Sequence, residues 1–148
     1  MLLTQRADAL KNHAGQVSFP GGRIESTDSG PIAAALRETR EEIGLDARHV
    51  HVLGYLPDHL IVSGYRVTPV VAFVDPGSRL ELAADEVRST FEVPLSYAFD
   101  TPNHHVRLRR IGDQDVEVYE IPFGPNRIWG ATAGMLMTLY ELVTSGPQ

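Results

Sequence analysis

Three glutamates with helical spacing are the residues of this chain best suited to chemistry. Glu38, Glu41 and Glu42 stand at positions i, i+3 and i+4, so on a helix they fall within an arc of roughly 100°. Carboxylates this close repel one another, and a hard divalent cation such as Mg²⁺ prefers oxygen ligands. The spacing therefore indicates a metal site. The alternative is a solvated helix face on which Arg37 and Arg40 pair with their neighbours.

The residues before these glutamates add a family resemblance. Gly22 is followed, after five intervening residues, by Asp28, and later by the run from Arg37 to Gly44. In this order they resemble the Nudix hydrolase signature, which has a glycine, an acid and then Arg-Glu-x-x-Glu-Glu-x-Gly. Asp28 stands where Glu is usual, and eight residues separate it from Arg37, one more than usual. The resemblance implies an α/β Nudix fold, a mixed β-sheet sandwiched between α-helices, as a single domain over residues 1–148.

A second motif, at the start of the chain, resembles that of the coenzyme A pyrophosphatase branch of this family. Lys11 stands where the branch usually has arginine, which keeps the charge but loses the bidentate fork. The extra residue before Arg37 and the stretch Ile128-Trp129-Gly130-Ala131-Thr132-Ala133 are similar to the branch as well. Related sheets have chain before Leu2, so either the natural chain begins upstream or the first strand is shortened. The motif reads Leu2-Leu3-Thr4-Gln5-Arg6-Ala7, Lys11, Gly15 and Phe19-Pro20-Gly21-Gly22.

The resemblance implies an enzyme that hydrolyses the pyrophosphate bond of coenzyme A (CoA) or its thioesters. The products would be 3′,5′-ADP and 4′-phosphopantetheine or its acyl form. Mg²⁺ or Mn²⁺ would be held by Glu38, Glu41 and Glu42 and would polarise the phosphate. The general base is left open between Glu41 and Glu86. For Glu86, the alternative is a helix N-terminal residue that favours the helix dipole.

Five further residues complete the predicted site. Arg37 is expected to serve catalysis by holding neighbouring carboxylates or loop carbonyls in place. Arg6 and Lys11 are expected to bind phosphates of the substrate, with plain surface charge as the alternative. Gly21 and Gly22 are expected to let the backbone approach the substrate or the metal closely.

Composition limits the class of protein. The 148 residues suit one domain, and 43% hydrophobic with 22% charged residues is ordinary for a soluble globular protein. No apolar run is long enough to span a membrane, and the first residues do not form a secretory signal. A net charge of −6 argues against non-specific nucleic-acid binding, and the absence of cysteine excludes disulfides and thiolate metal sites. We expect a cytoplasmic enzyme with a small-molecule substrate, no nucleic-acid or membrane partner, and a homodimer left open.

Two other functions fit the same residues. A Nudix pyrophosphatase with this chemistry would also suit an ADP-sugar, a dinucleotide such as NADH, or a deoxynucleoside triphosphate. A Nudix-fold ligand-binding module without hydrolysis is the other alternative. It is disfavoured because degenerate members usually lose the glutamates that this chain keeps.

Helix signals place the glutamates. Proline near the first turn and glycine after the last predict a helix from Pro31 to Ile43, ended by Gly44. Glu25 and Asp28 are expected to order the preceding loop and to cap this helix. A near-continuously apolar segment predicts a central strand over residues 65–74. The other predicted strands are 2–6, 16–19, 50–56, 104–110 and 116–121, with loops at 7–15 and 57–64, a short helix or turn at 96–99, and a final helix from Ile128.

Overall fold

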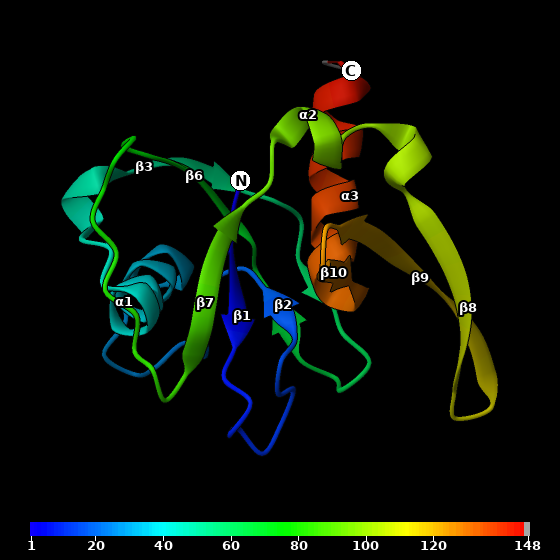
Figure 1. Cartoon of the computed structure of the whole chain (residues 1–148), viewed down its shortest axis with the longest axis horizontal. Coiled ribbons are helices and arrows are strands. Elements are labelled where there is room, and N and C mark those ends of the chain that lie inside the picture. Colours follow the sequence, from blue (N-terminus) through cyan, green and yellow to red (C-terminus); the bar gives the residue numbers. More distant parts are fainter. Residues whose placement is uncertain (147–148) are drawn as a thin grey trace. The chain divides into compact units, whose positions relative to one another are not determined.

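The computed structural model describes residues 1–146, which form two compact units (Figure 1). The N-terminal unit comprises Leu2–Tyr55 and Val70–Phe91. The C-terminal unit comprises Met1, Leu56–Pro69 and the chain from Glu92 onward. Among the described residues, none of the helices is both long and apolar enough to cross a membrane.

The N-terminal unit combines two small sheets with one long helix. Strand β1 (Leu2–Arg6) lies between β2 (Val17–Ser18) and β7 (Val87–Glu92), and β3 (Val50–Tyr55) pairs antiparallel with β6 (Val70–Val74). Helix α1 (Pro31–Ile43) is followed by the 3₁₀ turn η1 (Ala47–His49). The end of α1 anchors the core of this unit. Its buried members are Ile43, Leu45 and Val87, against which Leu2, Val50, Leu80 and Leu82 pack.

Helix α1 has the predicted bounds, but not the predicted cap. It ends at Gly44, whose φ of 68° is left-handed and whose N–H donates to the Arg40 carbonyl at 2.9 Å. The N-cap residue is Gly30, and no side chain caps it. The expectation that Glu25 and Asp28 cap the helix is therefore wrong. The Asp28 carboxylate turns to the Glu25 N–H and to Arg37 instead, so that it orders the loop.

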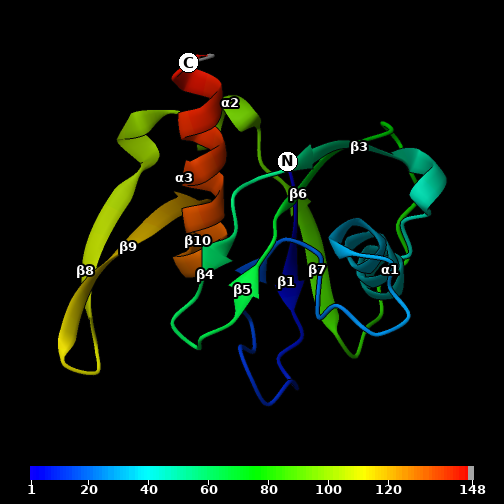
Figure 2. The ribbon, with the colours of Figure 1, turned by 180° about the vertical axis from the view of Figure 1, so that it is seen from behind.

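The C-terminal unit is an antiparallel sheet with helices. Strand β9 (Gln114–Phe123) lies between β10 (Asn126–Trp129) and β8 (His105–Ile111), and α3 (Gly130–Thr144) continues directly from β10 (Figures 1 and 2). The buried residues of this unit include Ile121 of β9, Ile128 of β10, and Ala133 and Leu136 of α3. The other elements are β4 (His59–Leu60), β5 (Arg66–Val67), α2 (Leu95–Ala98) and the 3₁₀ turn η2 (Thr101–Asn103).

Three sequence predictions about the elements need correction. The predicted strand 65–74 is two strands, β5 and β6, because Pro69 has no N–H to donate to a ladder. Strand β6 is not central: its sheet has two strands, and Phe73 is 66% exposed. Strand β4 lies within the predicted loop 57–64. The final helix begins at Gly130, since Ile128 and Trp129 belong to β10.

Candidate metal-binding and catalytic site

Glu42 is the buried carboxylate of the predicted site. It lies on the last turn of α1, is only 6% exposed, and accepts a hydrogen bond from the Gly21 N–H at 3.1 Å. Burial raises the pKa of the Glu42 carboxyl to about 7, and the negative charges of Glu38 and Glu86 add to the shift. The Gly21 N–H and the positive charge of Arg6 act in the opposite direction. Glu42 is therefore held where a negative charge is poorly solvated and incompletely balanced.

Gly22 brings the loop backbone against Glu38. A Cβ atom at this position would lie 2.3–2.5 Å from the three carboxyl atoms of Glu38, closer than any real contact. The absence of a side chain is thus what lets the Gly21–Gly22 segment lie over both Glu38 and Glu42. Glu38 is itself largely buried, with 16% of its side chain exposed. The structure brings these four predicted residues together.

Arg37 is the centre of a separate set of contacts. Its Nε and Nη2 atoms donate to the two oxygens of Asp28 at 3.1 and 3.0 Å, in a bidentate fork. Nη1 donates to Glu38 and Glu41 at 3.0 and 2.9 Å, and Nη2 also donates to the Arg23 carbonyl at 2.9 Å. The guanidinium group lowers the pKa of Asp28, whose side chain is 6% exposed, and the Asp28 and Glu38 carboxylates raise the pKa of Arg37. Arg37 thereby ties the loop after Gly22 to α1.

The third helix glutamate is more exposed than the other two. Glu41 is held by Arg37, and 54% of its side chain is exposed. Across residues 1–146, no group of three or more His, Cys, Asp or Glu side chains is arranged to hold a metal ion. The role of Glu41 as a metal ligand therefore stays a prediction, as does its role as a base. Glu86 lies close enough to Glu42 for their charges to repel.

The two predicted phosphate contacts have different environments. Arg6, at the end of β1, is near enough to Glu42 to favour its charged form. Its Nε atom is buried and has no hydrogen-bond partner in the described structure. Lys11 is exposed in the loop between β1 and β2. The sequence left Arg6 open between a phosphate contact and a surface charge, because nothing in the motif showed that this side chain interacts with Glu42.

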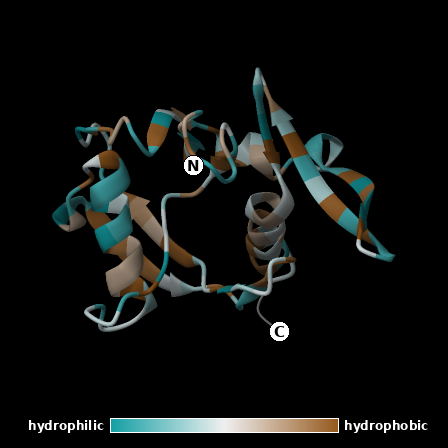
Figure 3. Ribbon diagram, turned by 90° about the horizontal axis from the view of Figure 1, so that it is seen from below, coloured by the Kyte–Doolittle hydropathy of each residue, from teal (hydrophilic) through white to brown (hydrophobic). Residues whose placement is uncertain are grey.

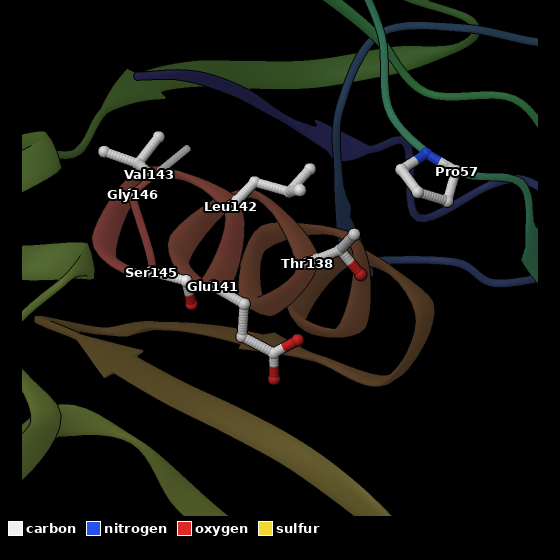
Figure 4. A pocket seen from close by; sticks show the side chains of 7 residues that line it. All are labelled: Pro57, Thr138, Glu141, Leu142, Val143, Ser145 and Gly146. Atoms are coloured by element: carbon white, nitrogen blue, oxygen red, sulfur yellow. The ribbon is translucent and has the colours of Figure 1, made fainter. Parts of the chain in front are cut away.

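Two hollows on the surface involve other residues. One, of about 710 Å³, lies along the C-terminal half of α3, and its only charged lining residue is Glu141 (Figure 4). A second, of about 400 Å³, lies at the start of α1 between Ser29 and Tyr55. Neither contains a predicted site residue, so the candidate site rests on the contacts around Glu42 and Arg37.

Known proteins match most of this chain. Residues 1–111 match the profile of the NUDIX domain. Proteins from Citrobacter koseri and Escherichia coli K12, each described as "Uncharacterized Nudix hydrolase NudL", are 43% identical over 143 residues. Each alignment covers 94% of this chain and 72% of the relative.

Solved structures share the fold at low sequence identity. A Nudix hydrolase from M. smegmatis, RenU, superposes with a TM-score of 0.63 at 19% identity, covering 99% of this chain and 76% of that one. A C. elegans Ap4A hydrolase has a TM-score of 0.54 at 18% identity, covering 64% and 68% of the two chains. These likenesses confirm the α/β Nudix fold. Together with the domain match and the 43% identity, they establish that this chain belongs to the Nudix hydrolase family.

Proposed function

We propose that this Nudix hydrolase cleaves the pyrophosphate bond of CoA and its thioesters, giving 3′,5′-ADP and 4′-phosphopantetheine or its acyl form. The observation that carries the proposal is the pair formed by Glu42 and Arg6. The buried Glu42 carboxylate lies within electrostatic range of the Arg6 guanidinium, whose Nε is buried and has no hydrogen-bond partner in the described structure. A divalent cation and a phosphate group would satisfy both. The Leu2–Ala7 motif, which resembles that of the CoA pyrophosphatase branch, supports CoA as the substrate.

The residues around Glu42 fit a divalent cation. Glu38 and Glu42 offer carboxylate oxygens beside the Gly21–Gly22 backbone, and Glu86 adds negative charge. Mg²⁺ commonly uses only one or two carboxylates and keeps several waters, so three converged side chains are not required. When bound, the cation supplies Lewis-acid polarisation of the phosphate.

The remaining residues would bind the substrate, hold the site in place and act as the general base. Arg6 would bind a phosphate oxygen, and Lys11 would add a point charge from its loop. Arg37 would hold the loop and Glu38 in place. For the general base we favour Glu86 over Glu41, because the Glu41 carboxylate is already held by Arg37. We further propose that the chain acts as a single domain in the cytoplasm, with Mg²⁺ or Mn²⁺ as its cofactor.

A substrate panel tests the proposal. The purified protein is incubated with CoA, ADP-ribose, NADH and deoxynucleoside triphosphates in Mg²⁺ or Mn²⁺, and the products are separated by chromatography. We expect the highest kcat/KM for CoA or an acyl-CoA, with 3′,5′-ADP as a product. A preference for another substrate would retain the Nudix chemistry but overturn the CoA assignment. Tight CoA binding without products would favour a ligand-binding module.

The Glu42→Gln variant tests the role of Glu42 in metal binding. Loss of the buried carboxylate should lower kcat/KM by at least about 100-fold, the upper end of the effect of losing an outer partner of a metal site. Glu117→Gln is the matched control, because Glu117 is exposed on β9 and loses the same charge. A Glu42→Gln variant with a near-normal rate in Mg²⁺ would contradict the metal assignment.

A further inference from the structure

One face of the sheet β10–β9–β8 gathers arginines around the only tryptophan of the chain. Alternate residues of a strand share a face, and so do residues paired across strands. The register pairs Glu120 with His105 on one side and with Trp129 on the other. The face that contains Glu120, here called the arginine face, therefore also carries three arginines. They are Arg107 and Arg109 of β8 and Arg127 of β10.

The arginine face is more positive than its carboxylate can balance. Arg107 and Arg127 both bond to Glu120, at 3.0 and 2.7 Å, and 61% and 43% of their side chains are exposed. Arg109 forms no ion pair with any of residues 1–146. The arginine face thus carries three guanidinium groups and one buried carboxylate, which pairs with two of them, whereas the chain as a whole has a net charge of −6. An anion that meets this acidic protein would be attracted here.

The opposite face of the same strands has a different character. It carries Val106, Leu108 and Arg110 of β8, and Arg110 pairs with Asp115 at 3.4 Å. Figure 3 shows the resulting alternation of hydrophilic and hydrophobic residues along the hairpin. The charge excess is therefore a property of the arginine face and not of the whole ribbon.

Trp129 holds two of the arginines within reach of one ligand. The guanidinium carbon of Arg109 lies 4.7 Å from the centre of the Trp129 ring, and that of Arg127 lies 5.2 Å from it. Cation–π contacts of this kind leave the N–H groups of a guanidinium free to donate to an anion. Guanidinium groups bind phosphate oxygens bidentately, which makes phosphate the anion that suits them best.

We propose that the arginine face is a binding site for a small phosphate anion with at least two negative charges, held by Arg109, Arg127 and Arg107. The proposal does not rest on CoA hydrolysis, because the site uses none of the residues assigned to it. Its occupant is a free anion, since the charge excess is confined to one face of one small sheet.

Inorganic pyrophosphate is the probe, and the fluorescence of Trp129 is the readout, because this is the only tryptophan in the chain. The full chain is titrated in EDTA, so that no divalent cation carries the anion to Glu42. Sodium chloride at matched ionic strength gives the baseline. We expect a saturable change in fluorescence that sodium chloride does not reproduce.

Two single-charge variants locate the site. Arg109→Gln should weaken pyrophosphate binding about tenfold, as expected for one lost charge-assisted contact. Arg110→Gln removes the same charge one residue away, on the opposite face, and should leave the dissociation constant within about twofold. Circular dichroism checks that both variants fold, and the Glu42→Gln hydrolysis assay stays independent of either result.

Three outcomes would overturn the proposal. In the first, pyrophosphate changes the fluorescence no more than sodium chloride does. In the second, the two variants weaken binding equally, which indicates general electrostatic attraction. In the third outcome, the fluorescence would depend on protein concentration and not on pyrophosphate, which indicates that a second copy covers the face.

Discussion

At the scale of single residues, Arg37 links more groups than any other described side chain of the candidate site. All three of its nitrogens donate, to Asp28, Glu38, Glu41 and the Arg23 carbonyl. A planar guanidinium fork can reach these acceptors together, whereas a single ammonium group cannot. The site therefore depends on the shape of Arg37 and not only on its charge.

Arg37→Lys should lower kcat/KM for the preferred substrate by about tenfold, the lower end of the effect of losing an outer partner of a metal site. The charge is kept, but the fork to Asp28 is lost, so the loop after Gly22 is held less firmly. Arg40→Lys, on an exposed position of the same helix, is the control and should be neutral. Equal rates for both variants would show that Arg37 acts only through its charge.

Residue types were predictable from the sequence, but their grouping was not. The spacing of Glu38, Glu41 and Glu42 allows all three to face one cation, because an arc of roughly 100° is narrow. In the structure, Arg37 Nη1 donates to both Glu38 and Glu41, and of these two only Glu38 is largely buried. Nothing in the spacing shows which glutamate an arginine will hold, because Arg37 and Arg40 are both within reach.

At the scale of elements, the end of α1 decides where Glu42 lies. Gly44 has a left-handed φ of 68°, and a Cβ atom there would lie 2.8 Å from the Cβ and 2.9 Å from the carbonyl oxygen of Glu81. The helix thus stops against the following chain, one residue after the buried Ile43. Both the conformation and the close approach require glycine.

Gly44→Ala should lower the free energy of unfolding by more than about 2 kcal/mol. The left-handed conformation alone costs a non-glycine residue about 1–2 kcal/mol, and the contact with Glu81 adds to it. Gly124→Ala is the matched control, because Gly124 has a φ of 56° and nothing within 4 Å of its Cβ position. Denaturant titration measures both. If the two variants lose equal stability, the contact with Glu81 has no cost.

The stability of the protein should depend on pH in acid through Glu120, the buried carboxylate of the β10–β9–β8 sheet. Hydrogen bonds from Arg127, with the charges of Arg127 and Arg107, lower the pKa of Glu120 below its ordinary 4.5. A carboxyl whose pKa is lowered on folding stabilises the fold above its unfolded pKa, and this stability is lost as pH falls through the folded pKa. The contribution should be complete above about pH 4.5 and fade in more acidic solution.

Glu120→Gln should therefore reduce stability by about 1 kcal/mol at pH 7 and progressively less below pH 4.5. Thermal unfolding of both proteins from pH 3 to 7 measures the difference, with Glu117→Gln as an exposed control on the same strand. A constant difference across this pH range would show that the carboxylate charge does not contribute.

Element boundaries were predictable where local chemistry sets them. Proline and glycine delimit α1, and its bounds agree with the sequence prediction. The prediction of one strand over residues 65–74 was wrong because apolar content was given more weight than the missing N–H of Pro69. The short strands β4 and β5 pair only with each other, so no local pattern marked them. The arginine face was missed because its residues meet through strand register, which joins Arg109 to a tryptophan twenty residues later.

At the scale of the whole molecule, the excess of acidic residues means that a bound cation should stabilise the folded state as well as support catalysis. The chain carries 19 acidic and 13 basic lysine or arginine residues, and Glu42 lies buried beside two further carboxylates. A cation that binds only the folded state stabilises it by mass action, by about 2.7 kcal/mol at a concentration one hundred times its dissociation constant.

Mg²⁺ should therefore raise the Tm of the protein by several degrees, beyond any effect of sodium chloride at equal ionic strength. Glu42→Gln should abolish this rise. In EDTA at pH 8, the same variant should be at least as stable as the natural sequence, because the substitution removes a buried charge beside Glu38 and Glu86. Glu117→Gln should keep the full rise. A Glu42→Gln protein that still gains stability from Mg²⁺ would place the cation elsewhere, whereas one that unfolds in EDTA would show that Glu42 is needed for the fold itself.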